Sequence, residues 1–300
     1  MIAPLRANTL EGQRVFEVQG LASQSLPLVL SCPHSGSYYP RSMRRLTQLD
    51  EQELRASEDV AVDTLFAPLI ERGAVRLKAK IARAYVDLNR QPDELDESMF
   101  EALAEHTTAQ NTPRVRANLG VVPAVVSQDK PLYSQPLPAG EAERRLAAVY
   151  HPYHMALDEL VQRTLARFGC CLLVDCHSMP DQPQLADFVI GTRFSASCDE
   201  GIAPPLQAAL SRSAHQVTLN APFAGGAITQ RYAKSNRNFE GASIASQSLQ
   251  IEVNRRLYLD GFELSDGAER VQQIVCEAVL AALAHLPQNM NQDAQRLAAQ

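Results

Sequence analysis

Short apolar runs alternate along the chain with stretches of helical periodicity. Residues 26–34 form an apolar run that ends in a Pro-His-Ser-Gly turn. Residues 170–177 form an uninterrupted apolar run, which is typical of a central strand covered on both faces. Residues 247–258 indicate another strand that ends in charged residues. Residues 75–90 alternate apolar and polar positions and predict one or two further strands.

Three segments have the pattern of helices. Residues 57–72 begin with Ser57 as an N-cap and with acids in the first turn, followed by an apolar face. Residues 140–168 predict a long helix that stops at Gly169, and a final helix covers residues 266–285. The alternation of strands and helices predicts an α/β fold with a mixed, mostly parallel central sheet and helices on both faces.

Two long stretches have no clear periodicity. Residues 91–139 are rich in proline and too long for an ordinary connection. We interpret them as an excursion that covers or lines a functional site, with disorder as the alternative. Residues 193–246 form a second irregular stretch, and the polar tail after residue 287 is expected to be frayed. We expect residues 1–300 to form a single α/β domain.

The composition narrows the class of protein. Hydrophobic residues make up 45% and charged residues 21% of the 300 residues, which allows an ordinary globular core. The net charge of −6 and the lack of a dense Lys/Arg run argue against a nucleic-acid partner. No run has the apolar length of a signal peptide or a membrane span, so we expect a cytoplasmic protein with no membrane partner. The six cysteines form no CxxC pair and are interpreted as buried free thiols.

Polar clusters follow four of the predicted strands. In open α/β sheets, ligands bind at the carboxyl ends of the strands. This rule selects His34 and the segments 87–90, 175–177 and 252–256. Because these clusters would converge at one edge of the sheet, the sequence predicts a functional site there.

Two of these clusters contain a histidine on a strand-end turn. Imidazole is a good zinc ligand, and a catalytic zinc usually keeps three protein ligands and one water. Either histidine alone is more often structural, but His34 and His177 in similar contexts favour a metal pair. The third ligand is expected to be an acid from the first turns of the first predicted helix, where Glu58, Asp59 and Asp63 are available. Asp59 is preferred, and dipole compensation at a helix N-terminus is the structural alternative for these acids.

Glu252 is the candidate proton carrier. It lies in an apolar strand, where an unpaired charge is costly. It is therefore expected to act in a site, as a general acid–base group, or to pair structurally with Arg255 or Arg256.

Fixed positive charge for a substrate is available at both ends of the segment 83–90. Arg83 begins it and Arg90 ends it, and Asn89 lies beside Arg90. A guanidinium binds a carboxylate through two parallel hydrogen bonds and can also stabilise an oxyanion. This chemistry suits an acidic substrate.

Two other features are given less weight. His151 and His154 belong to a metal-like Tyr-His-Pro-Tyr-His sequence, but they lie on the long predicted helix and are expected to face a neighbouring element or solvent. Cys176 adjoins His177, yet adjacent residues of a strand point to opposite faces, which makes the pair poorly placed for Cys–His catalysis.

Six motifs follow one another along most of the chain. They are PHSG (33–36), EDVAVD (58–63), DLNR (87–90), DCHSMP (175–180), NAPFAGGAIT (220–229) and LQIEVNRRLY (249–258). In this order they resemble the N-formylglutamate amidohydrolase family, and the resemblance extends over roughly residues 26–260.

The resemblance implies hydrolysis of N-formyl-L-glutamate to glutamate and formate, often as the last step of histidine degradation. It also implies a single hydrolytic domain with a fold similar to zinc carboxypeptidases and aspartoacylase, of the phosphorylase/hydrolase-like class. By this resemblance His34 and His177 match the first and last metal ligands and Glu252 matches the general base. The substrate and oxyanion groups match Arg83, Asn89 and Arg90.

The chain departs from the wider group at one position. That group places its acidic ligand three residues after the first histidine, where this chain has Ser37. A hydroxyl does not replace a carboxylate, so the metal would have to recruit another acid, for which Asp59 is the preferred substitute.

The leading hypothesis is attack of a metal-activated water on the acyl carbonyl of a small acidic N-acyl amino acid. One divalent ion, zinc or else iron, cobalt or nickel, would bind His34, Asp59 and His177. Further substrate contacts are expected from Arg193, Asn220, Thr229 and Arg231. The alternatives are a related deacylase or carboxypeptidase for another small N-acyl amino acid, and a non-catalytic protein that binds the metal or ligand. The sequence leaves the oligomeric state open.

Overall fold

The largest sheet of the described residues has seven strands. The computed structural model describes residues 8–127, 130–212, 214–232 and 246–286. Within this part, the strand order is β10–β9–β11–β8–β4–β5–β3. The strands are β3 (Phe16–Gln19), β4 (Leu28–Cys32), β5 (Val75–Ala79), β8 (Cys171–Met179), β9 (Phe188–Gly191), β10 (Val217–Leu219) and β11 (Ser246–Asn254).

The sheet is mixed and mostly parallel, as the sequence predicts. β11 pairs in parallel with β8, as β8 does with β4 and β10 with β9, whereas β9 runs antiparallel to β11. Every residue of β8 and of β11 is buried. Burial on both faces fits the continuous apolar start of β8, whereas in β11 apolar and polar residues alternate. β11 ends at Asn254, whose side chain accepts a hydrogen bond from the backbone of Arg256 and closes the turn η3 (Arg255–Leu257).

The described residues also form three two-stranded antiparallel ribbons outside this sheet. They pair β1 (Thr9–Leu10) with β2 (Gln13–Arg14), β6 (Val125–Ser127) with β7 (Lys130–Pro131), and β12 (Leu259–Asp260) with β13 (Glu263–Leu264).

The contacts within the chain define two compact units. One comprises the described parts of Met1–Val18, Cys32–Ala61 and Leu77–Leu157, and the other those of Gln19–Ser31, Val62–Arg76 and Asp158–Gln300. The expectation of one hydrolytic domain over residues 1–300 stays a prediction.

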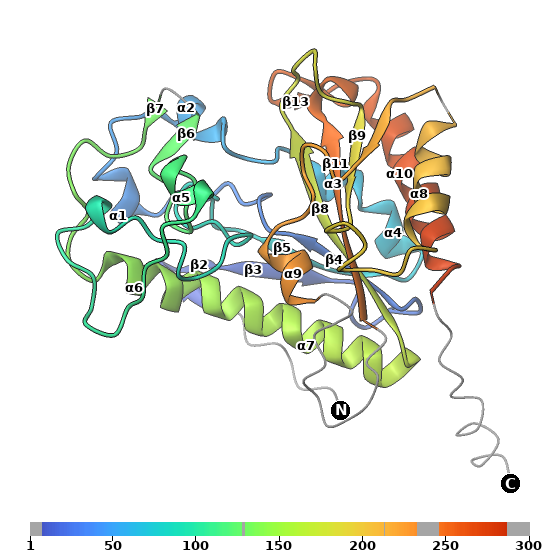
Figure 1. Ribbon diagram of the computed structural model, residues 1–300, viewed down its shortest axis with the longest axis horizontal. Helices are drawn as coiled ribbons and strands as arrows, with labels where there is room; N and C mark the ends of the chain where they lie inside the picture. Colours follow the sequence, from blue (N-terminus) through green and yellow to red (C-terminus); the bar gives the residue numbers. More distant parts are fainter. Residues whose placement is uncertain (1–7, 128–129, 213, 233–245, 287–300) are drawn as a thin grey trace, which may run out of the picture. The chain divides into compact units, whose positions relative to one another are not determined.

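In the second unit, helices pack beside the strands. α8 (Ala203–Ser211) and α10 (Ala268–Leu283) lie side by side, and α10 also packs against α3 (Val62–Leu65) and α4 (Pro68–Glu71) (Figure 1). Gln272 of α10 donates to the carbonyl of Thr64 at 3.1 Å. The unit also contains α9 (Ala227–Arg231). The predicted final helix is confirmed, while the tail after residue 287 lies outside the described residues.

The first unit contains shorter helices and the start of the longest one. The short helices are α1 (Arg41–Arg44), α2 (Glu51–Arg55), η1 (Glu97–Met99) and α5 (Pro113–Arg116). The predicted long helix is confirmed as α6 (Glu141–Arg145), the π-helical turn η2 (Leu146–Tyr150) and α7 (His151–Phe168), which follow one another without a break. Gly169, with φ of 74°, ends it.

The prediction of one helix over 57–72 is wrong. Only α3 and α4 are helical, because Ala61 has a left-handed φ of 55° and Pro68 starts a new helical turn rather than continuing the previous one. Asp59 therefore lies in an irregular segment between α2 and α3. Its position is not set by a helix N-terminus.

The structure makes other expectations more specific. Residues 75–90, predicted to form one or two strands, contain the single strand β5 and an isolated bridge from Ile81 to Tyr38. Apart from its undescribed residues 128 and 129, the excursion 91–139 is described as turns and irregular backbone that contain the short elements η1, α5, β6 and β7. The sequence pattern indicated neither β9 nor α8. β9 lies just before the second irregular stretch, 193–246, and α8 lies within it. Residues 233–245 of that stretch are outside the described residues.

Candidate active site and metal centre

The turn that carries His34 packs against the segment that follows β5. The backbone nitrogen of Tyr38 donates to the carbonyl of Lys80 at 3.0 Å. Gly36 makes this approach possible, because a Cβ atom at that position would lie 2.2 Å from the carbonyl oxygen of Ile81. The backbone around His34 is thus fixed without help from its imidazole.

His34 is held between two aspartates. Its Nε2 lies 2.8 Å from Oδ1 of Asp87, and its Nδ1 lies 3.4 Å from Oδ2 of Asp59. The backbone nitrogen of Asp59 also donates to the carbonyl of His34 at 3.0 Å. This backbone contact places Asp59 beside the imidazole.

Asp87 is the centre of a buried charge network. It accepts hydrogen bonds from the backbone nitrogen of Asn89 (2.8 Å) and from Nε of Arg83 (3.0 Å), and Nη2 of Arg90 lies 3.8 Å away. Burial raises the pKa of Asp87, but Arg83, Arg90 and His34 outweigh that effect and hold its pKa well below the ordinary value. Asp87 is therefore an ionised partner for His34, a role that the sequence analysis did not assign.

One face of the β8–β11 pair carries a row of polar side chains. The parallel register sets Gln250 beside Asp175 and Glu252 beside His177. Alternate residues of a strand share a face, so all four side chains lie on the same side of the sheet. Nε2 of His177 is 2.9 Å from Oδ2 of Asp175, and Gln250 donates to Oε1 of Glu252 at 2.7 Å. The proposed proton carrier and a proposed metal ligand are thus strand neighbours.

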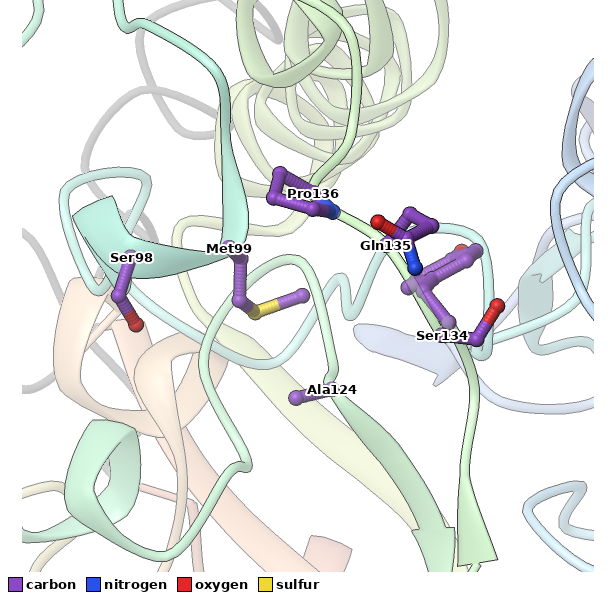
Figure 2. A pocket seen from close by; sticks show the side chains of 7 residues that line it. Ser98, Met99, Ala124, Ser134, Gln135 and Pro136 are labelled. Atoms are coloured by element: carbon purple, nitrogen blue, oxygen red, sulfur yellow. The ribbon is translucent and has the colours of Figure 1, made fainter.

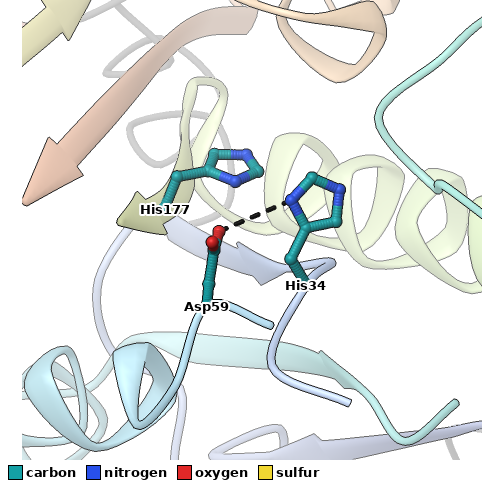
Figure 3. A group of neighbouring side chains, drawn as sticks. All are labelled: His34, Asp59 and His177. Carbon is teal, nitrogen blue, oxygen red and sulfur yellow. Dashed lines mark ion pairs between the residues drawn. The ribbon is translucent and has the colours of Figure 1, made fainter. Parts of the chain in front are cut away.

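His34, Asp59 and His177 form a buried group of possible metal ligands (Figure 3). One ligand atom of each lies within 4.8 Å of those of the other two. Two imidazoles and a carboxylate suit zinc and related divalent ions, and this donor set leaves a position for water. Both histidines also have an aspartate at Nε2, which is typical of metal-binding histidines. The residues present therefore fit a metal ion and could hold one.

Asp59 is the acid in this group, and its two competitors are placed differently. Glu58 accepts hydrogen bonds from the hydroxyl of Tyr39 (2.5 Å) and from Nε of Arg55 (3.5 Å). Burial raises the pKa of Glu58, and these two donors oppose the rise. Asp63 is half-buried on α3 and does not belong to the group.

The residues after β9 form a strained turn. Arg193, Phe194 and Ser195 have φ values of 49°, 55° and 64°, which are uncommon for residues other than glycine. Oδ1 of Asn220 accepts hydrogen bonds from the backbone nitrogens of Thr192 (2.8 Å) and Phe194 (3.3 Å) and holds the turn. The turn directly follows the strand that pairs with β11. Substrate binding by Arg193 and Asn220 stays a prediction.

The two remaining residues from the irregular stretch contact other parts of the protein. The buried hydroxyl of Thr229 donates to the carbonyl of Gly226 at 2.9 Å. Arg231 forms a two-point ion pair with Asp158, with distances of 2.5 Å and 3.3 Å. These contacts do not test the predicted role of Thr229 and Arg231 in substrate binding, which stays a prediction.

The excursion 91–139 contacts the Asp87–Arg90 segment. The backbone nitrogen of Asp87 donates to the carbonyl of Val121 at 2.8 Å, and Nε of Arg90 donates to the carbonyl of Leu119 at 2.8 Å. Part of the excursion thus supports this segment. Its role as a cover or lining of the active site stays a prediction.

Residues of the excursion also line a cavity of about 250 Å³ that is open to solvent (Figure 2). It is lined by Ser98, Met99, Ala124, Tyr133, Ser134, Gln135 and Pro136. None of the residues predicted for the site lines it. This cavity is therefore separate from the His34–Asp59–His177 group.

The cysteines and the two histidines of the long helix, which the sequence analysis gave less weight, lie outside the possible metal group. All six cysteines are buried free thiols, as predicted, and the thiol of Cys176 lies 3.4 Å from a carbonyl within its own strand. On α7, His151 is exposed whereas His154 is buried.

Among the described residues, every helix is too short or too polar to cross a membrane.

Comparison with known sequences gives consistent matches over most of the chain. The family model described as N-formylglutamate amidohydrolase matches residues 26–259. Two relatives named N-formylglutamate deformylase, from Pseudomonas aeruginosa and Pseudomonas putida, are 29% and 28% identical to the chain. The alignments cover 81% and 86% of this chain and 86% and 92% of the relatives.

Comparison with solved structures agrees with the sequence matches. The N-formylglutamate amidohydrolase from Ralstonia eutropha JMP134 is 29% identical, with a TM-score of 0.80 over 90% of this chain and 98% of that chain. A gene product from Agrobacterium tumefaciens, at 18% identity and a TM-score of 0.67 over 90% of this chain and 94% of that one, shares the fold.

Proposed function

The chain belongs to the N-formylglutamate amidohydrolase family, and from that premise we propose that it hydrolyses N-formyl-L-glutamate to glutamate and formate in a metal-dependent reaction. The observation that carries the chemistry is the in-register placement of Glu252 beside His177 on one face of the sheet. This pairing puts a proton carrier next to a residue of the possible metal group.

The metal would be held by His34, Asp59 and His177. Because an aspartate faces Nε2 of each imidazole, Nδ1 would be the binding nitrogen in both. Zinc fits this donor set best, with iron, cobalt and nickel as the other candidates. When bound, the ion would make a water acidic enough to attack at neutral pH and would polarise the formyl carbonyl.

Glu252 would carry the proton of the reaction. Its carboxylate would take a proton from the attacking water as the water oxygen bonds to the formyl carbon. As the carbon–nitrogen bond breaks, the same carboxylate would pass that proton to the nitrogen of glutamate. Gln250 supports this role because its hydrogen bond fixes the orientation of the carboxylate.

Arginine side chains would supply the positive charge for a doubly acidic substrate. Arg83 is the more accessible of the two arginines at Asp87, with 25% of its side chain exposed against 11% for Arg90. We therefore assign the developing oxyanion to Arg83. The substrate carboxylates and backbone would be bound by Asn89, Arg90, Arg193, Asn220, Thr229 and Arg231.

Metal removal and a matched pair of histidine variants test the proposal. Dialysis against a chelator should abolish formate release from N-formyl-L-glutamate, and added zinc should restore it. His177→Ala should lose metal and activity together, whereas His151→Ala, which changes an exposed histidine, should lose neither.

Two outcomes would contradict the proposal. Full activity in the metal-free protein would rule out the metal mechanism. Release of acetate from N-acetyl amino acids, with no formate release from N-formyl-L-glutamate, would identify a related deacylase instead.

A further inference from the structure

The Tyr-His-Pro-Tyr-His sequence at 150–154 contacts the loop that carries Asp87. Nε2 of His154 lies 3.0 Å from the carbonyl oxygen of Leu88, and the hydroxyl of Tyr150 donates to the carbonyl of Arg90 at 2.8 Å. A carbonyl oxygen only accepts, so Nε2 of His154 must carry a hydrogen. Both side chains are buried, at 3% exposure.

A third donor from the same long helix reaches the same stretch of backbone. Nη1 of the fully buried Arg145 donates to the carbonyl of Tyr85 at 2.9 Å, and its guanidinium lies 4.5 Å from the centre of the Tyr85 ring. Glu141 anchors Arg145 through Nε at 2.8 Å. Three side chains of one helix therefore hold three carbonyls within six residues of chain, at 85, 88 and 90.

The π-helical turn η2 makes this arrangement possible. The donors stand at positions 145, 150 and 154, so the first two are five residues apart. In a regular α-helix, residues five apart point in directions that differ by roughly 140°. η2 comprises the residues between Arg145 and His151 and widens that turn, so that all three donors face one loop.

The loop transmits this constraint to the candidate metal centre. Asp87 lies in the sequence between Tyr85 and Leu88, whose carbonyls are constrained, and its Oδ1 is 2.8 Å from Nε2 of His34. Its orientation depends on the backbone that the helix fixes. We propose that Arg145, Tyr150 and His154 are positioning residues, which hold this loop so that Asp87 keeps His34 oriented toward the metal. This inference rests on the metal centre of the proposed function.

Variants that remove one donor at a time test the positioning role. Tyr150→Phe removes only a hydroxyl, and His154→Leu removes the ring donor. Loss of one hydrogen bond should weaken zinc binding about fivefold in each variant. Hydrogen exchange of the amides in residues 85–90 should accelerate by a similar factor. His154→Gln, whose amide can donate to the same carbonyl, should restore both values.

Tyr153→Phe is the matched control. Tyr153 is a buried tyrosine on the same helix, but its hydroxyl lies 3.5 Å from the carbonyl of Leu77 on β5 rather than from the loop. Its zinc affinity and loop exchange should equal those of the wild type, even if its melting temperature changes. Zinc affinity is measured by competition with a fluorescent chelator, and exchange by mass spectrometry.

The outcomes separate this inference from the proposed function. If Tyr150→Phe and His154→Leu lower the melting temperature but leave zinc affinity and loop exchange unchanged, the positioning role is overturned. Equal losses in His154→Leu and His154→Gln would overturn it as well. Neither measurement needs a substrate, so a lack of formate release would count only against the proposed reaction.

Discussion

Replacing Asp87 by asparagine tests the support of His34 most directly. Asp87→Asn keeps the size of the side chain and an oxygen that accepts hydrogen bonds, but it removes the charge. In the structure that charge is buried and faces Nε2 of His34 at 2.8 Å and Nε of Arg83 at 3.0 Å. The substitution therefore isolates the electrostatic part of the contact.

The expected magnitude has two parts. A hydrogen bond to a charged group contributes about 1.5–3 kcal/mol to stability. Because Arg83 is partly exposed and the asparagine oxygen still accepts, we expect a loss of about 2 kcal/mol in the metal-free protein, or a fall in Tm of roughly 4–8 °C. Loss of a partner that orients a metal-binding histidine lowers metal affinity by about 10- to 100-fold.

Two measurements and one matched variant check this expectation. Tm is measured calorimetrically without metal, and zinc affinity by competition with a chelator. Asp187→Asn is the control, because Asp187 also contacts a histidine (His215, 3.4 Å) and an arginine (Arg256, 2.8 Å) but has no contact described with the metal group. It should lose stability and keep zinc affinity. If Asp87→Asn binds zinc as tightly as the wild type, Asp87 does not orient His34 for a metal.

Three further predictions address the fold, the chemistry and pH. Gly36→Ala should lower Tm strongly because its Cβ would lie 2.2 Å from a backbone oxygen, whereas Gly201→Ala, with nothing within 4 Å, should not. Glu252→Gln should lower kcat about 10²- to 10⁴-fold while metal content stays unchanged, and lost metal would instead indicate a ligand. Burial raises the pKa of Asp187, but a backbone amide and an arginine lower it below 3.8 overall, so its stabilisation is present above that pH and lost as pH falls further. Urea unfolding of wild type and Asp187→Asn should therefore differ most near neutral pH and converge in acid.

The two central strands could be predicted from the apolar residues along them. β8 begins with a continuous apolar run that ends before Asp175, and β11 has Leu249, Ile251 and Val253 at alternate positions. The pairing of Glu252 with His177 could not be predicted, since the register of two strands far apart in sequence depends on the whole sheet. The role of Asp175 was accessible, because residues two apart on a strand share a face.

The sequence analysis selected Asp59 as the acid beside the two histidines, but the helix that it predicted for this segment is wrong. An N-cap serine, acids and an apolar face fit a helix, yet the left-handed backbone at Ala61 and the proline at 68 break it. Nothing local requires Ala61 to be left-handed. The hydrogen bond from Asp59 to the carbonyl of His34 is a tertiary contact, and tertiary contacts override weak local propensities.

The contacts of Tyr150 and His154 on the long helix could not be predicted from the sequence either. Tyr150 and His154 lie in a motif that suggests ligands when read alone. Only the π-helical turn and the fold of the loop reveal which atoms they contact. A sequence pattern with the ordinary helical period contains no sign of such a turn.

The shared register of β8 and β11 has a consequence for how this chain can vary. Point substitutions near Glu252 change one side chain, but inserting or deleting one residue between Gln250 and Glu252 would turn the carboxylate to the opposite side of the sheet. Length is therefore more tightly constrained than identity along this strand. A change of length within the nine residues that pair with β8 would therefore shift the register of every residue that follows it in the strand.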